Sequence, residues 1–233
     1  MTIKVAICAR TLNAELHVDR FCKAYDWADD IFVADGGSTD YTLLLLAKYP
    51  KVTLLHFDEW VQKPGFTVKR NPEGKHINFA LDAGEASGAD WLIHDDIDSA
   101  PNANLQHAAR RILEASVDNT RVFVPRLYLW GEHEHFPRLA GPEQGYGIWA
   151  WRPGVVRWSE EDPFIPTSSV PLVETTEGLR IGPPYCLLHY FCLTPTEAER
   201  KLAFYRENGQ NPGHKHWLEA CGPVEPLPEW AAL

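Results

Sequence analysis

The sequence predicts an α/β fold in which a mostly parallel central sheet is flanked by helices. In the first hundred of the 233 residues, short apolar runs alternate with segments of helical spacing. The second run ends in Gly36-Gly37 and the fourth in an Asp-rich turn, as expected where loops leave a sheet. Hydrophobic residues make up 45% of the chain, enough for a well-filled core. Short apolar runs that alternate with helices imply a parallel sheet covered on both faces.

Four strands are expected in this half, at residues 3–8, 31–35, 52–57 and 91–94. The first helix is expected to follow an Asn13 cap, and the second to follow a cap at Thr39 or Asp40 and run through Leu43–Leu46. A third helix is predicted by apolar and small residues at helical spacing, which are Ile77, Ala80, Leu81 and Gly84.

The second half of the chain does not continue the regular alternation of strand and helix patterns. A helix is expected to bury Leu105, Ala109, Ile112 and Leu113. A strand is expected at 122–130, and a hairpin over 148–158 that turns at Pro153-Gly154. The last helix is expected to begin at Thr196, whose spacing to Glu199 matches a capping box. The Pro-rich tail from residue 222 is expected on the surface. No internal repeat or linker is visible, so one domain is the expectation.

Composition excludes some functional classes. The formal net charge is −10, which argues against a strongly basic nucleic-acid-binding surface. The five cysteines are an odd number without a C-x-x-C pair, so buried thiols in a reducing compartment are expected. No secretory signal and no apolar run near the ~20 residues of a membrane span are visible. A soluble, cytoplasmic protein is therefore the expectation.

The strongest chemical signal is the segment WLIHDDIDS at residues 91–99. A buried strand delivers Asp95, Asp96 and Asp98 into a turn at its carboxyl end, where ligands of parallel sheets bind. Asp96 and Asp98 alternate along an extended chain, so both can face the same side. Clustered carboxylates favour a hard cation such as Mg²⁺ or Mn²⁺. The alternative is a solvated acidic turn before a helix.

A second signal is VADGGSTD at residues 33–40. Asp35 stands at a strand end, and the two glycines after it let the backbone approach a ligand closely. A carboxylate in this place can accept hydrogen bonds from a nucleoside. By itself, the segment is also typical of an ordinary strand-to-helix turn.

In combination, these segments resemble glycosyltransferase family 2. Four features occur in the family's order: R-T-L-N-A-E at 10–15, D-G-G-S-T-D at 35–40, K-H-I-N-F-A-L-D-A-G at 75–84, and D-I-D at 96–98. The resemblance implies a GT-A (Rossmann-like) fold and a metal-dependent, inverting transfer of a sugar from a nucleotide diphosphate sugar. Residues 1–100 would bind the donor and 101–221 the acceptor.

The resemblance also implies roles for individual residues. Asp35 would read the nucleoside, and Asp96 and Asp98 would hold the ribose and the diphosphate-bound metal. The other implied donor contacts are Arg10 and Thr11 at the base and Lys75 at the pyrophosphate. His189, in a segment similar to the C-terminal part of bacterial members, is the candidate third metal ligand. An imidazole suits Mn²⁺ better than Mg²⁺.

The acceptor half contains the candidates for a general base. Related enzymes use a carboxylate to deprotonate the acceptor hydroxyl. Glu161 is the first candidate here and Glu160 and Asp162 follow it, although the histidine that often precedes this position is missing. Glu132 and Glu134 are reserves. Four tryptophans are expected to contact acceptor or to pack in the core: Trp130, Trp149, Trp151 and Trp158.

The sequence leaves the substrates open. A UDP-sugar is the expected donor, and the acceptor is a hydroxyl of a glycan or another soluble or polymeric molecule. One alternative acceptor is a hydroxymethylated pyrimidine in DNA. Another enzyme class, a haloacid-dehalogenase-like phosphohydrolase, would use Asp96 as its nucleophile, but its motif normally opens the chain.

Overall fold

The computed structural model describes residues 2–62, 69–131, 133–135, 146–160, 171–172, 177–207 and 225–231. Four parallel strands form half of the main sheet, in the order β6-β1-β2-β3. Their bounds are β1 Val5–Thr11, β2 Asp30–Asp35, β3 Val52–His56 and β6 Trp91–His94. These are the four strands expected from the apolar runs, and the α/β class with a mostly parallel sheet is confirmed.

The other half of the sheet is mixed. Strand β10 (Tyr146–Trp151) lies antiparallel between β6 and β8 (Arg121–Trp130), and β9 (Glu134–His135) and β15 (Glu225–Pro226) continue the order beyond β8. Strand β14 (Leu187–Cys192) pairs parallel with β8 and antiparallel with β7 (Ser99–Pro101). The remaining short strands are β4 Val61–Gln62, β5 Lys69–Arg70, β11 Arg157–Trp158, β12 Pro171–Leu172 and β13 Leu179–Arg180.

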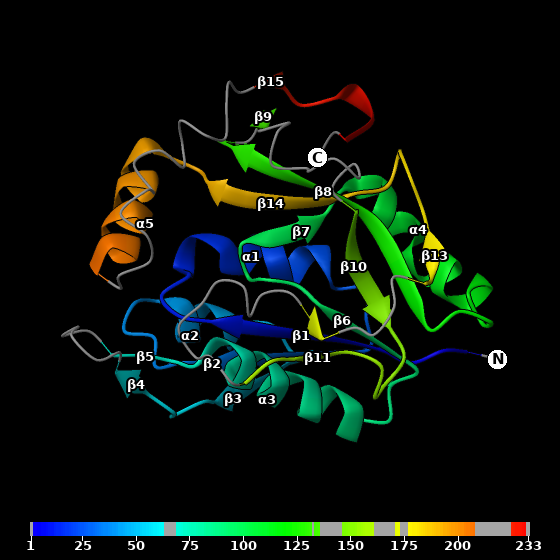
Figure 1. Cartoon of the computed structure of the whole chain (residues 1–233), viewed down its shortest axis with the longest axis horizontal. Helices are drawn as coiled ribbons and strands as arrows, with labels where there is room; N and C mark the ends of the chain where they lie inside the picture. Colours follow the sequence, from blue (N-terminus) through cyan, green and yellow to red (C-terminus); the bar gives the residue numbers. More distant parts are fainter. Residues whose placement is uncertain are drawn as a thin grey trace.

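Helices cover both faces of the parallel strands, as Figure 1 shows. Alternation along β1 explains this, because successive side chains of a strand point to opposite faces. Val5, Ile7 and Ala9 belong to a core with α1 and α4, whereas Ala6 and Cys8 belong to a second core with α3. The bounds are α1 Glu15–Ala24, α2 Thr42–Leu46, α3 Glu73–Ala86, α4 Ala103–Ala115, α5 Pro195–Glu207 and the 3₁₀ turn η4 Glu229–Ala231.

The expected caps of three helices are wrong. The cap position of α2 is Tyr41, not Thr39 or Asp40, although the Asp40 carboxylate accepts from the Thr42 amide at 2.9 Å. Asn13 does not cap α1: it lies at φ 51°, and its side chain accepts a hydrogen bond from the Thr39 backbone amide at 2.8 Å. Helix α5 begins at Pro195, not at Thr196. The Thr194 hydroxyl accepts from the Glu197 amide at 3.1 Å, because proline is favoured at the first helical position and moves the cap one residue earlier.

The expected hairpin at 148–158 is also wrong. The chain does turn at Gly154, which has φ +76°. The strands on either side do not pair with each other, since β10 is enclosed by β6 and β8, and β11 pairs with β12. The backbone groups of β10 are occupied on both edges, so β11 finds its partner elsewhere.

The end of the chain is held more tightly than expected. Strand β15 pairs with β9, and Trp230 packs against a core with Leu129 and Leu188. Asn102, the cap of α4, donates to the Trp230 carbonyl at 3.4 Å. The described part of the tail is therefore docked on the body of the protein. Among the described residues, no helix is long and apolar enough to cross a membrane.

Gly74, in the first turn of α3, lies against the chain that follows β11. Its substitution tests how closely the helix packs there. A Cβ built at Gly74 would lie 1.8 Å from the Ser159 carbonyl oxygen. Alanine in a helix normally gains about 1 kcal/mol over glycine. We expect the opposite sign here: Gly74→Ala should lower the free energy of unfolding by about 1–3 kcal/mol, as overpacking does. Chemical denaturation measures this change.

Gly147→Ala is the control, because its Cβ would meet only the Arg126 side chain, at an ordinary 3.9 Å. This variant should unfold within about 1 kcal/mol of the wild type. A Gly74→Ala protein that is as stable as the wild type or more stable would show that α3 is not pressed against Ser159.

Candidate metal and donor site

The acidic turn after β6 presents its side chains alternately inward and outward. Asp95 and Ile97 are buried, whereas Asp96 and Asp98 are partly exposed, with 29% and 19% of their side-chain surface accessible. This is the alternation expected from the sequence. The turn is stabilised by the Ser99 amide, which donates to the Asp96 carbonyl at 2.8 Å. Two carboxylates are thus delivered to the same side at the carboxyl end of β6.

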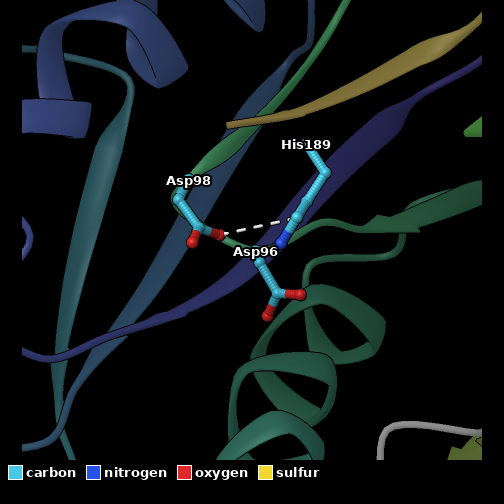
Figure 2. A group of neighbouring side chains, drawn as sticks. All are labelled: Asp96, Asp98 and His189. Carbon is cyan, nitrogen blue, oxygen red and sulfur yellow. Dashed lines mark ion pairs between the residues drawn. The ribbon is translucent and has the colours of Figure 1, made fainter. Parts of the chain in front are cut away.

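His189 reaches this turn from a strand far away in sequence. It lies on β14 opposite Ser99 of β7, and its Nδ1 is 3.7 Å from an Asp98 carboxylate oxygen (Figure 2). Asp96, Asp98 and His189 each offer a ligand atom, and these atoms all lie within 4.8 Å of one another. The structure therefore brings together the three residues expected as metal ligands.

The His189 ring has two further neighbours. Its Nδ1 hydrogen bonds to the Ser99 hydroxyl at 2.8 Å, and Tyr128 of β8 packs edge-on against it with ring centroids 5.2 Å apart. Coordination of a metal through Nδ1 would require the Ser99 hydroxyl to give up this bond. The tyrosine ring restricts the imidazole to an orientation facing Asp98.

Asp95 anchors the acidic turn from inside the protein. Its two carboxylate oxygens accept from the Tyr25 hydroxyl at 2.6 Å and from the Arg126 guanidinium at 3.3 Å. Burial raises the pKa of Asp95 to about 7, against the lowering effect of Arg126. Asp95 therefore belongs to the framework, and neither Tyr25 nor Arg126 was singled out from the sequence. A tyrosine at helical spacing and an arginine in a strand gave no signal of this contact.

The loops after β1 and β2 are locked together by polar groups. The Asn13 amide donates to the Ser38 hydroxyl at 2.8 Å, and the Thr39 amide donates back to the Asn13 side chain. The Glu15 amide donates to Asp40 at 3.2 Å. These residues lie in the R-T-L-N-A-E and D-G-G-S-T-D segments, so several of the family-like positions hold the two loops in place.

Asp35 shapes the loop that follows it. It is 1% exposed, and its oxygens accept from the Gly37 amide at 2.8 Å, the Ser38 amide at 2.9 Å and the Ser38 hydroxyl at 2.5 Å. Each carboxylate oxygen has two lone pairs, so these bonds do not use the full capacity of the group. Thr11, its register partner on β1, is also buried, and its hydroxyl hydrogen bonds to no described residue.

Trp60 lies beside the same loop and was not among the residues singled out. A Cβ at Gly37 would lie 3.2 Å from its indole ring, which is 38% exposed. Glu59, the residue before Trp60, makes two contacts. Its carbonyl accepts from Asn71 at 3.0 Å, and its carboxylate pairs with Lys75 at 2.7 Å. Lys75, expected at the pyrophosphate, is thus engaged with Glu59, which raises its pKa.

Arg10 contacts two carboxylates. Its Nη2 lies 2.5 Å from Glu73 of α3 and 3.5 Å from Asp96. Glu73 is buried at the first turn of that helix. Burial raises the pKa of Asp96, but Arg10, together with His94 and His189, more than offsets this effect, and the pKa lies below its usual value. Arg10 therefore stands at the acidic turn, in contact with Asp96.

The candidate bases are only partly described. Glu160 is exposed, and its carboxylate accepts from Asn78 of α3 at 2.8 Å. Asn78 also holds the Trp158 backbone, through bonds of 3.0 Å to its amide and its carbonyl. Glu161 and Asp162 lie outside the described residues, as does the reserve candidate Glu132. Glu134 is described and exposed, on β9.

Three of the four highlighted tryptophans belong to the core. Trp149 and Trp151 are fully buried on β10, and Trp158 is 5% exposed and packs against Trp151 with ring centroids 5.6 Å apart. Trp130 is partly exposed. Core packing, the alternative expected for at least two of the four, is therefore confirmed for Trp149, Trp151 and Trp158. The thiols of Cys8, Cys22 and Cys186 are buried as expected.

Comparisons with known proteins show similarity in fold. No family model matches the chain, and no curated protein matches its sequence. The structure is similar to that of Staphylococcus aureus TarS 1–349, at 16% identity over 94% of this chain and 70% of that chain, with a TM-score of 0.48. It is also similar to a mycobacterial protein, at 14% identity over 91% and 76% of the two chains, with a TM-score of 0.49.

A third similar structure is glucosyl-3-phosphoglycerate synthase from Mycobacterium tuberculosis, solved with Mn²⁺, UDP and glucosyl-3-phosphoglycerate. It shares 16% identity over 90% of this chain and 81% of that chain, with a TM-score of 0.48. In another structure of that enzyme the alignment covers 66% of this chain but only 57% of that one. These likenesses concern the general course of the chain alone.

The buried His76, which contacts the end of β2, should make the stability of the protein depend on pH. Its Nε2 donates to the Ala34 carbonyl at 2.8 Å, its ring stacks on Phe57, and burial lowers its pKa to about 4. An unfolded histidine titrates near 6.5, so the unfolded state takes up a proton first as the pH falls. Stability should therefore be complete above about pH 6.5 and fall by about 3 kcal/mol towards pH 4 from this group.

His76→Gln should show a shallower fall in the free energy of unfolding between pH 6.5 and pH 4 than the wild type. His107→Gln, which changes an exposed histidine of α4, is the matched control and should keep the wild-type slope. The interpretation fails if the His76 variant and the control have the same slope.

Proposed function

We propose that this protein is a metal-dependent glycosyltransferase that moves a sugar from a nucleotide diphosphate sugar to an acceptor hydroxyl. The observation that supports this most is the convergence of Asp96, Asp98 and His189 within 4.8 Å at the carboxyl edge of a parallel sheet. Two carboxylates and an imidazole are a suitable donor set for Mn²⁺, and for Mg²⁺ with a weaker preference. Carboxylates alone could be a solvated turn, but the histidine is brought to them from another strand.

The bound cation would hold diphosphate oxygens and neutralise charge on the leaving group. The protein's own part is to orient its ligands: Asp95 holds the turn from below, and Tyr128 and Ser99 hold the His189 ring. The carboxylates are therefore placed before the donor arrives, which is how a site avoids reorganisation during reaction.

The donor is proposed to lie along the carboxyl edge of β6, β1 and β2. Adjacent strands are about 4.8 Å apart, so the ends of β6 and β2 are separated by about 10 Å. A nucleoside diphosphate is extended, with phosphate at one end and base at the other. It would reach from Asp96 and Asp98 to the loop held by Asp35, where Trp60 offers an exposed aromatic face. A UDP-sugar is the donor we propose first.

The transfer step proposed is direct displacement with inversion. A carboxylate of the 160–162 segment would take the proton of the acceptor hydroxyl as its oxygen bonds to the anomeric carbon and the bond to the diphosphate breaks. Glu161 remains the first candidate, with Glu160 and Asp162 beside it. The link from Asn78 to Glu160 supports a fixed position of Glu160 against α3. The described residues support neither a DNA base as acceptor nor a phosphohydrolase.

Donor binding and transfer should depend on Asp98. UDP with Mn²⁺ should raise the melting temperature of the wild type, since ligand at a hundredfold excess over Kd adds about 2.7 kcal/mol of stability. Asp98→Ala should lose this shift and transfer activity, while circular dichroism and melting without ligand stay native. Asp118→Ala, an exposed aspartate after α4, is the control and should keep the shift. A wild-type protein indifferent to every nucleotide diphosphate tried would contradict the proposal.

The general base should affect catalysis and spare binding. Glu161→Gln keeps the shape of the side chain and removes the proton acceptor, so kcat should fall at least ~10²-fold while donor affinity is unchanged. Glu160→Gln and Asp162→Asn should cause smaller losses. Single-turnover rates of the three variants, with Glu134→Gln as a fourth, separate the candidates. Wild-type rates in the 160–162 variants would place the base elsewhere.

A further inference from the structure

Arg10 is held between the proposed metal site and a buried carboxylate. It stands near the carboxyl end of β1, next to β6 in the sheet. Its guanidinium meets Glu73 at 2.5 Å and Asp96 at 3.5 Å. Glu73 is 6% exposed, so this carboxylate has left water and depends on a charged partner. Asp96, by contrast, is partly exposed and belongs to the metal-ligand set.

This placement has a consequence for any cation bound at Asp96. A divalent ion there would share the carboxylate with Arg10, and like charges a few ångströms apart repel strongly where water is partly excluded. A diphosphate placed between the two cations would remove the repulsion, because its negative oxygens can coordinate the metal and accept hydrogen bonds from Arg10. Arginine is well suited to that contact, since its planar fork matches phosphate oxygens. Arg10 should therefore disfavour a metal bound alone and favour a metal bound with diphosphate.

We propose that Arg10 couples metal binding to donor binding, and that Glu73 is the positioning residue that keeps its guanidinium at Asp96. This inference rests on the proposed function and deepens it, because it assigns Arg10 to the diphosphate end of the donor instead of the base pocket. The chemical class recognised is a nucleoside diphosphate with a divalent cation. Metal and donor then bind as a unit, and neither is held tightly without the other.

Glu73 has a second role that an experiment must separate from this one. It lies in the first turn of α3, where a carboxylate also stabilises the helix. A purely structural Glu73 would lower the melting temperature when replaced but leave the coupling unchanged. A positioning Glu73 changes the coupling as well, and removing Arg10 in the same protein abolishes any further effect of Glu73→Gln on it.

The test is Mn²⁺ binding to the full chain, measured by calorimetry with and without saturating UDP. In the wild type, UDP should tighten Mn²⁺ binding about tenfold or more, within the usual range of coupled sites. Arg10→Gln should bind Mn²⁺ alone more tightly than the wild type, and UDP should improve this binding less than about threefold. Glu73→Gln should reduce the coupling to an intermediate value, and the double variant should behave like Arg10→Gln.

Arg157→Gln is the matched control, since the carboxylates that pair with Arg157 are Asp82 and Glu85 of α3, each at 2.6 Å, and not those of the acidic turn. It removes one positive charge and should keep wild-type coupling. The inference is overturned if Arg10→Gln retains wild-type coupling, or if the control loses it equally, which would indicate a general charge effect. A wild-type protein that binds neither Mn²⁺ nor UDP overturns the proposed function itself, which is a different result.

Discussion

The candidate site depends on one buried carboxylate. Asp95 has no exposed surface, and it is retained inside the protein by the Tyr25 hydroxyl and the Arg126 guanidinium. A buried carboxylate without partners costs several kcal/mol, so these two contacts specify one position for the turn. With Asp95 fixed inward and the turn closed by the bond from the Ser99 amide to the Asp96 carbonyl, Asp96 and Asp98 are left partly exposed. The acidic edge of the sheet follows from this interior contact between α1, β6 and β8.

A second constraint comes from the loops beside the turn. The polar residues of the segments 10–15 and 35–40 bond chiefly to one another, as in the exchange between Asn13 and Thr39. The two loops thus form a rigid border along the strand ends, and Asp35 maintains the backbone of the second loop. Some residues of these two segments hold the backbone at the edge of the sheet, and others are candidates for ligand contact. Polarity alone does not distinguish the two groups.

Local sequence was sufficient where one physical rule decides the outcome. The four parallel strands follow from short apolar runs, and the buried faces of α3 and α4 follow from helical spacing, as at Ile77 and Leu105. It was insufficient where two local solutions compete. Thr194 and Thr196 both offer a cap, and Pro195 decides between them. The turn at Gly154 resembles that of a hairpin, but a local sequence pattern does not show that β10 pairs with β6 and β8.

The same distinction applies to the site. By itself, the sequence determined that acidic residues end a buried strand, that Asp96 and Asp98 share a side, and that the candidate site lies at the carboxyl ends of the strands. The family resemblance named His189 as a candidate, but only the tertiary structure placed it beside them, since β14 pairs with β7 and Ser99 and His189 are 90 residues apart in the chain. The tertiary structure also decided that Arg10 lies at Asp96 and that Asp95 is framework. The physical reason is that strand register and helix packing bring distant residues into contact, and neither is encoded in the spacing of neighbours along the chain.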